Sequence, residues 1–117
     1  MEHTIEVDWT TQVGLRAVVI KTPMGHRCGY VGVDASHRLF GVNYGNVGGV
    51  DVHGELTFSD GQVDYPVFCA RDIWWFGFDT GHSFDAFNPK STGYCVRECE
   101  NMAHDLIHRA YKLTKED

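Results

Sequence analysis

Polar side chains that could do chemistry interrupt otherwise apolar, strand-like stretches of the chain at three places. The three clusters are His26-Arg27-Cys28, Asp51-Val52-His53-Gly54 and Asp79-Thr80-Gly81-His82. Histidine titrates near neutral pH, and beside a carboxylate it can bind a metal, transfer protons or hold a polar ligand. The clusters lie far apart in the sequence, so they can form one site only if the fold brings strand ends together. They indicate a candidate site without naming its reaction.

Metal binding is one chemistry that the clusters allow. Zinc needs three or four nitrogen, sulfur or oxygen ligands that converge on one point. The available ligands are His26, His53 and His82, together with Asp51 and Asp79. The chain has no HExxH motif and no cysteine-rich spacing, so hydrogen bonding of each histidine within its own turn is the favoured interpretation. We therefore expect no cofactor and keep a divalent metal as an alternative.

Nucleotide binding is a second chemistry. Arg27 could contact a phosphate in bidentate fashion, and Tyr30, Trp74 or Trp75 could stack on a base. Carboxylates of the clusters could accept ribose hydroxyls. The alternatives are core packing for the tryptophans and an ion pair with Asp51 or Asp79 for Arg27. The predicted ligand-binding set is His26, Arg27, Tyr30, Asp51, His53, Trp74, Trp75, Asp79 and His82.

Nucleophilic catalysis is the third chemistry. Cys28 with His26 or His53 could form a nucleophile and its base. A cysteine on an alternating strand is more typically a small buried apolar residue, and no third catalytic group is evident. The sequence thus favours a binding protein over an enzyme and leaves catalysis undecided.

Composition limits the class of protein. The 117 residues, 43% hydrophobic and 22% charged, fit a single globular domain over residues 1–117. The net charge is −6 and the ten lysines and arginines are scattered, which argues against direct binding of nucleic acid but allows a small phosphorylated ligand. No signal peptide or membrane span is evident, and the four cysteines form no CxxC pair. We expect free thiols, no membrane partner and a cytoplasmic location.

Hydrophobic periodicity predicts an α+β fold, with an antiparallel sheet of about five strands and a C-terminal helix packed on one face. We expect strands over residues 4–9, 12–21, 27–33, 50–58 and 73–78, and loops over 34–49 and 81–90. Ser91 or Thr92 could cap the helix. Its apolar face would comprise Cys95, Cys99, Met102, Leu106, Ala110 and Leu113.

Successive side chains of a strand point to opposite faces, which assigns each cluster residue to one face of its predicted strand. On the fourth strand, Asp51 and His53 would share one face. On the fifth, Trp74 would lie on one face, and Trp75 and Asp79 on the other. Because both faces of the fifth strand carry aromatic bulk, one should meet the helix and the other needs a loop or ligand to cover it.

Three segments carry a resemblance to a known family. They are Met24-Gly-His-Arg-Cys-Gly-Tyr-Val31, Asp51-Val-His-Gly-Glu-Leu-Thr-Phe-Ser59 and Trp74-Trp-Phe-Gly-Phe-Asp-Thr-Gly-His82. Their order, followed by a helix that carries Tyr94 and Glu98, resembles a family of small uncharacterised proteins of tailed bacteriophages. The chain differs from that pattern at Thr80, where a cysteine is expected, and at Glu55, where a glycine is expected. The resemblance implies an accessory protein of the host cytoplasm.

Three functions follow as hypotheses. The first is a binding protein, able to form a homo-oligomer, that captures a small polar ligand such as a nucleotide-derived host defence signal. It predicts a stacked aromatic, an arginine and no metal. The second is a hydrolase that uses a metal or a His-Asp pair, and it predicts at least three converging ligands. The third is a protein–protein inhibitor of a host factor, with the His and Asp clusters apart. The first is preferred; the link to host defence rests on analogy.

Overall fold

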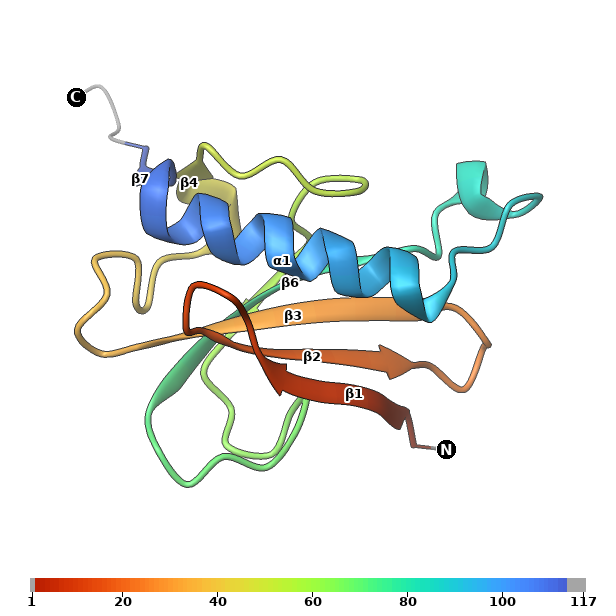
Figure 1. The fold of residues 1–117 in the computed structure, drawn as a ribbon, viewed down its shortest axis with the longest axis horizontal. Coiled ribbons are helices and arrows are strands. Elements are labelled where there is room, and N and C mark those ends of the chain that lie inside the picture. The colour runs from red at the N-terminus through yellow and green to blue at the C-terminus, as the bar shows by residue number, and fades with distance from the viewer. Residues whose placement is uncertain (1, 114–117) are drawn as a thin grey trace.

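The structure is a computed structural model that describes residues 2–113, and its main element is a five-stranded antiparallel sheet. Strands β1 (Thr4–Thr10), β2 (Arg16–Lys21) and β3 (Arg27–Asp34) form a meander, and β6 (Ile73–Asp79) and β5 (Phe58–Asp60) complete the order β1-β2-β3-β6-β5 (Figure 1). Alternating β-branched and aromatic residues favour these strands. Four of the five predicted strands form close to the predicted positions.

Helix α1 (Thr92–His108) lies across one face of the sheet (Figure 1). Ser91 caps it as predicted, because its hydroxyl accepts a hydrogen bond from the backbone N–H of Tyr94 at 3.1 Å. The predicted apolar face of the helix continued to Leu113, but α1 ends at His108. The backbone N–H groups of Arg109 and Ala110 both donate to the Asp105 carbonyl, which ends the helix. The chain then forms β7 (Tyr111–Lys112), which pairs with β4 (Val47–Gly48).

The sheet buries both faces, as its aromatic content requires. On the helix side, alternate strand residues pack against the apolar face of α1; the strands supply Val19, Val31, Phe76 and Phe78, and the helix supplies Cys99 and Met102. On the other side, the segment between β5 and β6 covers Val18, Ile20, Tyr30 and Trp75. The prediction that one face of β6 meets the helix and a loop covers the other is confirmed.

The predicted strand over residues 50–58 is wrong. Gly54 (φ +66°) and Glu55 (φ +68°) both adopt the left-handed conformation, which an extended strand does not allow. The backbone N–H groups of Asp51 and His53 donate to the Asp105 and Glu98 carboxylates of α1, at 3.1 Å and 2.7 Å, instead of to a neighbouring strand. Asp51 and His53 therefore do not share a sheet face. Only β5 is extended in this part of the chain.

The two predicted loops contain short 3-10 helices, η1 (Tyr44–Asn46) and η2 (Ser83–Asp85). The loop that carries η2 runs from β6 to α1 and projects from the body of the fold (Figure 1, cyan). Over residues 2–113, no helix combines the length and the apolar character needed to cross a bilayer.

Candidate functional site

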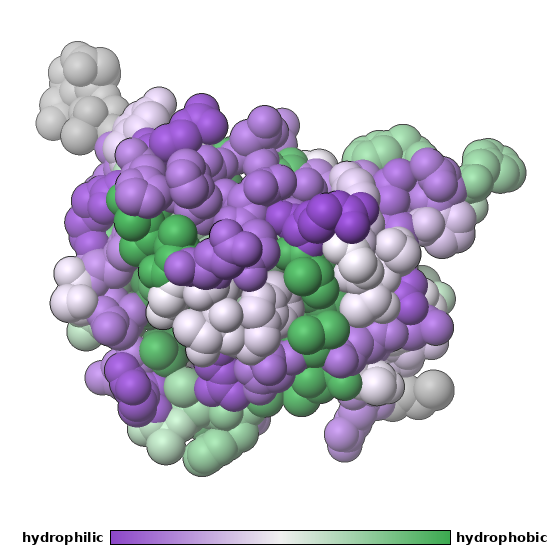
Figure 2. Space-filling model, in the orientation of Figure 1, coloured by the Kyte–Doolittle hydropathy of each residue, from purple (hydrophilic) through white to green (hydrophobic). Residues whose placement is uncertain are grey.

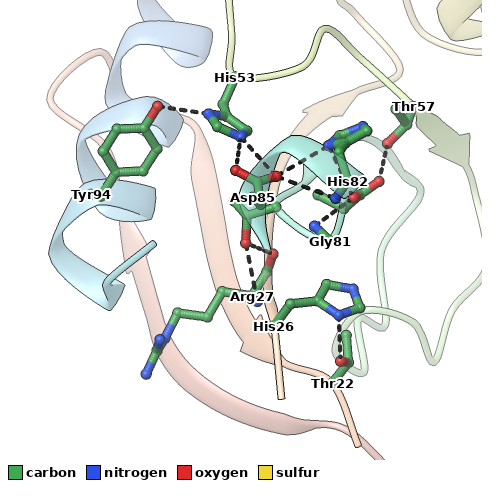
Figure 3. A network of polar contacts seen from close by, with 11 residues as sticks. Thr22, His26, Arg27, His53, Thr57, Gly81, His82, Asp85 and Tyr94 are labelled. Carbon is green, nitrogen blue, oxygen red and sulfur yellow. Dashed lines mark hydrogen bonds and ion pairs between the residues drawn. The ribbon is translucent and has the colours of Figure 1, made fainter. Parts of the chain in front are cut away.

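The candidate site lies at the end of the sheet where β3 begins and β6 ends (Figure 3). Three segments meet there: the loop before β5, which carries His53; the loop after β6, which carries His82 and Asp85; and the first turns of α1, which carry Tyr94. Fold topology thus joins residues that are far apart in sequence. We call His53, His82 and Asp85 the His-Asp centre.

Both ring nitrogens and the backbone N–H of His53 have hydrogen-bond partners. Its ring Nε2 lies 2.9 Å and 3.1 Å from the two carboxylate oxygens of Asp85, and its Nδ1 lies 2.8 Å from the Tyr94 hydroxyl. Its backbone N–H donates to Glu98 at 2.7 Å. These contacts set both the position and the ring orientation of His53, as in a preorganised functional group.

Asp85 is the buried anion of the centre, with a side chain only 4% exposed. Burial acts to raise its pKa, but the hydrogen bond and charge of His53, the backbone N–H of His82 and the nearby His82 ring outweigh it and bring the pKa below its ordinary value. The carboxylate is therefore ionised at neutral pH. A buried carboxylate between two imidazoles can orient a base, receive a proton or bind a cation.

His82 differs from His53 because its ring is incompletely bonded. Its Nδ1 is buried and has no hydrogen-bond partner among residues 2–113; the nearest carboxylate oxygens, of Asp79 and Asp85, both lie 3.5 Å away. The ring stacks on Phe84, with centroids 4.9 Å apart and planes within 9°. It also lies against Gly54, where a Cβ atom would come within 2.6 Å of the ring. Packing thus fixes the ring while Nδ1 stays available.

A pocket of about 420 Å³ opens beside the His-Asp centre. Its polar side chains include His26, His82, Asp85 and Lys90, and the backbone of Gly25 and Gly81 completes part of the wall; we call it the His26–Lys90 pocket. Volumes of this size are typical of small-molecule sites.

Exposed apolar side chains occur on the loops that wall this pocket. Phe84 is 65% exposed and Phe87 is fully exposed, and Met24, which lines the pocket, is 88% exposed. In Figure 2, apolar surface gathers on the projecting loop between β6 and α1, whereas the outer face of α1 is polar. The pocket therefore combines nitrogen donors inside with an apolar rim.

Some of the predicted site residues do come together. His53 and His82 lie with ring centroids 6.2 Å apart, and Asp79 lies 3.5 Å from His82. His26 lines the pocket, hydrogen-bonds Thr22 at 3.2 Å and packs against Gly81. The prediction that each histidine is satisfied within its own turn is wrong for His53, whose ring partners come from η2 and α1.

Arg27 forms an ion pair, as one of the two sequence interpretations predicted. Its partner is Glu6, not Asp51 or Asp79. Its guanidinium donates hydrogen bonds to both carboxylate oxygens of Glu6 in β1, at 2.7 Å and 3.2 Å, and to the Lys90 carbonyl at 3.0 Å. The guanidinium holds the pKa of Glu6 below its ordinary value. Arg27 does not line the His26–Lys90 pocket, so Lys90 is the cation that a ligand there would meet.

The remaining predicted residues lie away from the pocket. Tyr30 is buried and bonds Tyr65 at 2.6 Å, and Trp75 is fully buried beneath the same segment. Trp74 packs on the helix side and donates to the Val42 carbonyl at 2.9 Å. Asp51 lines a separate hollow beside the second half of α1. These side chains act in the core or at another surface, and none of them lines the His26–Lys90 pocket.

Three residues of the site are not in the ligand-binding set predicted from the sequence. From the sequence alone Asp85 is expected to lie on the solvated surface; that expectation is wrong, because η2 turns it inward between two histidines. Its spacing of three residues from His82 was the available signal. Tyr94 and Glu98 are four apart on α1 and so share a face, and both contact His53. Only the tertiary fold reveals that contact.

Thiol and phenol chemistry is disfavoured here. Burial, with a contribution from Asp79, raises the pKa of Cys28 to about 11, so the thiolate needed for attack is scarce at neutral pH. Burial and the nearby Glu98 charge also raise the pKa of Tyr94, and its hydroxyl stays protonated as a hydrogen-bond partner of His53. The titratable groups that remain for chemistry at this site include the His-Asp centre, His26 and Lys90.

Comparison with protein-family models, curated proteins and solved structures finds no match to this chain. The resemblance to tailed-bacteriophage proteins therefore stays a prediction.

Proposed function

We propose that this protein binds a small anionic ligand in the His26–Lys90 pocket, and that the ligand is a nucleotide-derived signal of the host. On this proposal the protein is a bacteriophage accessory protein that withdraws such a signal in the host cytoplasm. The observation that carries the proposal is the pocket itself, which is lined by two histidines, His26 and His82, and by Lys90.

The charge distribution supports an anionic ligand. Asp85 also lines the pocket, but its carboxylate oxygens already accept hydrogen bonds from His53 and the His82 backbone. Lys90 has no ion-pair partner among residues 2–113, and its ammonium group lies 5.3 Å from the centre of the Tyr94 ring. A phosphate could therefore take Lys90 as its counter-ion.

The exposed ring of Phe84 favours a nucleotide over other anions. Phe84 does not itself line the pocket, but it stacks on His82, which does. One face of Phe84 stacks on His82 and the ring remains 65% exposed, which leaves apolar surface on which a base can pack. In this arrangement Lys90 takes the role that the sequence suggested for Arg27, and Phe84 the role suggested for the tryptophans.

Binding is tested with a panel of mononucleotides, cyclic mononucleotides and cyclic dinucleotides, by calorimetric titration in EDTA. Lys90→Ala and His26→Ala should each weaken binding of the preferred nucleotide, by about tenfold or more for the lost charge-assisted hydrogen bonds. Lys112→Ala is the matched control, because Lys112 is exposed on β7 and does not line the pocket. Failure of every nucleotide to bind, or equal binding by Lys90→Ala and the wild type, would contradict the proposal.

A hydrolase is the second candidate function, favoured by the convergence of His53, His82 and Asp85 within 4.8 Å of one another. Three converging ligands are what that hypothesis required. It predicts turnover of an activated phosphodiester, such as bis(p-nitrophenyl) phosphate, that His82→Ala abolishes. The third hypothesis, inhibition of a host protein, required the His and Asp clusters to stay apart, and the pairing of His53 with His82 disfavours it.

A further inference from the structure

Two imidazoles and one carboxylate converge in the His-Asp centre, and each offers a ligand atom within 4.8 Å of the other two. We propose that this centre is a binding site for a first-row transition-metal dication, with zinc the best-suited ion. His53 Nε2, His82 Nδ1 and one Asp85 oxygen would be its protein ligands. The inference does not rest on the nucleotide proposed above, because the chain alone supplies these ligands. It departs from the binding hypothesis drawn from the sequence, which predicted no metal.

The donor set selects the class of metal. Imidazole nitrogen suits zinc, copper, iron and nickel, whereas magnesium and calcium take oxygen ligands almost entirely. Only one of the three ligands here is an oxygen donor, Asp85. A zinc-type ion is therefore expected to bind far more tightly than magnesium.

Distances within the centre fit a tetrahedral ion. Zinc–nitrogen and zinc–oxygen bonds of about 2.0–2.2 Å at tetrahedral angles separate neighbouring ligand atoms by roughly 3.3–3.5 Å. His53 Nε2 lies 2.9 Å and 3.1 Å from the Asp85 oxygens, and His82 Nδ1 lies 3.5 Å from the nearer one. The two histidine ligand atoms lie within 4.8 Å of one another, so a bound ion would draw the two imidazoles to the tetrahedral separation.

The unbonded nitrogen of His82 is the independent observation. Buried polar atoms almost always have a hydrogen-bond partner, and an exception calls for an explanation. His82 Nδ1 is buried and lacks one, although carboxylates of Asp79 and Asp85 lie just beyond bonding distance. A cation among these groups would bind the nitrogen and neutralise the carboxylates at once.

The surroundings of His53 fit a metal ligand equally well. A ligating histidine usually bonds through its second ring nitrogen to a fixed group, which sets its orientation. Tyr94 provides that bond to Nδ1 at 2.8 Å. A phenol hydroxyl can donate or accept, so the contact persists whether His53 carries its proton on Nε2 without metal or on Nδ1 with metal.

Three protein ligands leave one tetrahedral position for a further ligand. His82 and Asp85 both line the His26–Lys90 pocket, so that position is expected to face the pocket. Open positions are characteristic of catalytic zinc sites, whereas structural sites are closed by four protein ligands. The metal would then contact whatever small molecule occupies the pocket.

Metal binding is tested on the full chain, stripped with EDTA and without nucleotide. Cobalt(II) should give the visible absorption of a tetrahedral site, zinc should displace it, and bound zinc should reach about one ion per chain. His82→Ala should weaken zinc binding by roughly 100-fold. His104→Ala is the control, since His104 and His108 form an exposed histidine pair on α1 with centroids 4.6 Å apart.

Each result of the zinc titrations either supports or overturns the proposed site. Zinc affinity lost in His82→Ala and retained in His104→Ala supports the site. No zinc binding by the wild type, equal affinity in His82→Ala, or loss in His104→Ala overturns it. Because Asp85 is buried, Asp85→Asn is used as a second variant only if its circular dichroism matches the wild type. Nucleotide titration in EDTA is scored separately, so failure of the metal site and failure of the ligand proposal are distinguishable.

Discussion

Replacing Gly54 by alanine should displace His82 and weaken metal binding. Gly54 has φ +66°, and an added Cβ would lie 2.6 Å from His82 Cε1 and 3.1 Å from Nδ1. Carbon atoms in contact normally stay about 3.5–4.0 Å apart, so the ring must retreat by about 1 Å. Phe84 stacks on the ring at 4.9 Å and limits its movement.

The size of the effect follows from this displacement. Misplacing a group that positions a metal ligand typically costs about 10–100-fold in affinity, or about 1.4–2.7 kcal/mol. The left-handed backbone adds a separate cost of about 1–2 kcal/mol to the free energy of folding. Gly54→Ala is therefore expected to reduce both zinc affinity and stability.

Gly41→Ala separates these two effects. Gly41 has φ +81°, and a Cβ there would meet nothing within 4 Å. Urea unfolding in EDTA should show similar stability losses for the two variants, whereas zinc competition titration should show lost affinity for Gly54→Ala alone. Equal zinc affinities in the two variants would refute the reasoning, because the clash with His82 would then have no consequence.

Three further predictions concern other contacts of the fold. Tyr94→Phe removes the hydroxyl bonded to His53 Nδ1 and should lower zinc affinity by about tenfold; an unchanged competition titration would show that this bond does not position the ring. Glu6 has a depressed pKa in the folded state because of Arg27, so the pair stabilises the fold above the ordinary carboxyl pKa and the benefit is lost as pH falls. Glu6→Gln should thus cost about 1–2 kcal/mol at neutral pH. In urea unfolding the difference should shrink as the pH falls below the ordinary carboxyl pKa, and a constant difference would contradict the assignment. Cys28, with its pKa raised to about 11, should resist thiol reagents at neutral pH until the chain unfolds, and rapid labelling of the native protein by mass spectrometry would contradict its burial.

Local sequence patterns predicted four strands of the sheet and the start of the helix. Alternation located β1, β2, β3 and β6, and the hydroxyl of Ser91 located the start of α1. These features depend on neighbours in the sequence, so they can be inferred without the tertiary structure. The same pattern failed at Gly54 and Glu55, because residues that read as a strand adopt left-handed backbone conformations.

The site was harder to predict because its contacts are long-range. The bond between His53 and Asp85 joins residues 32 apart, and that between His53 and Glu98 joins residues 45 apart. Arg27 finds its partner 21 residues away in Glu6, which sequence periodicity placed only on the polar face of the first strand. Residue types indicated which side chains could do chemistry, but only the packing of loops against α1 determines which of them meet.

The claim that His53, Asp85 and His82 form one binding centre is tested most directly by crystallography at the zinc absorption edge. Crystals of the full chain grown with zinc should show an anomalous peak between His53 Nε2, His82 Nδ1 and Asp85, about 2.0–2.2 Å from each ligand atom. A map in which zinc occupies only the His104–His108 pair, or in which the His53–Asp85 hydrogen bond persists with no peak beside it, would contradict the account.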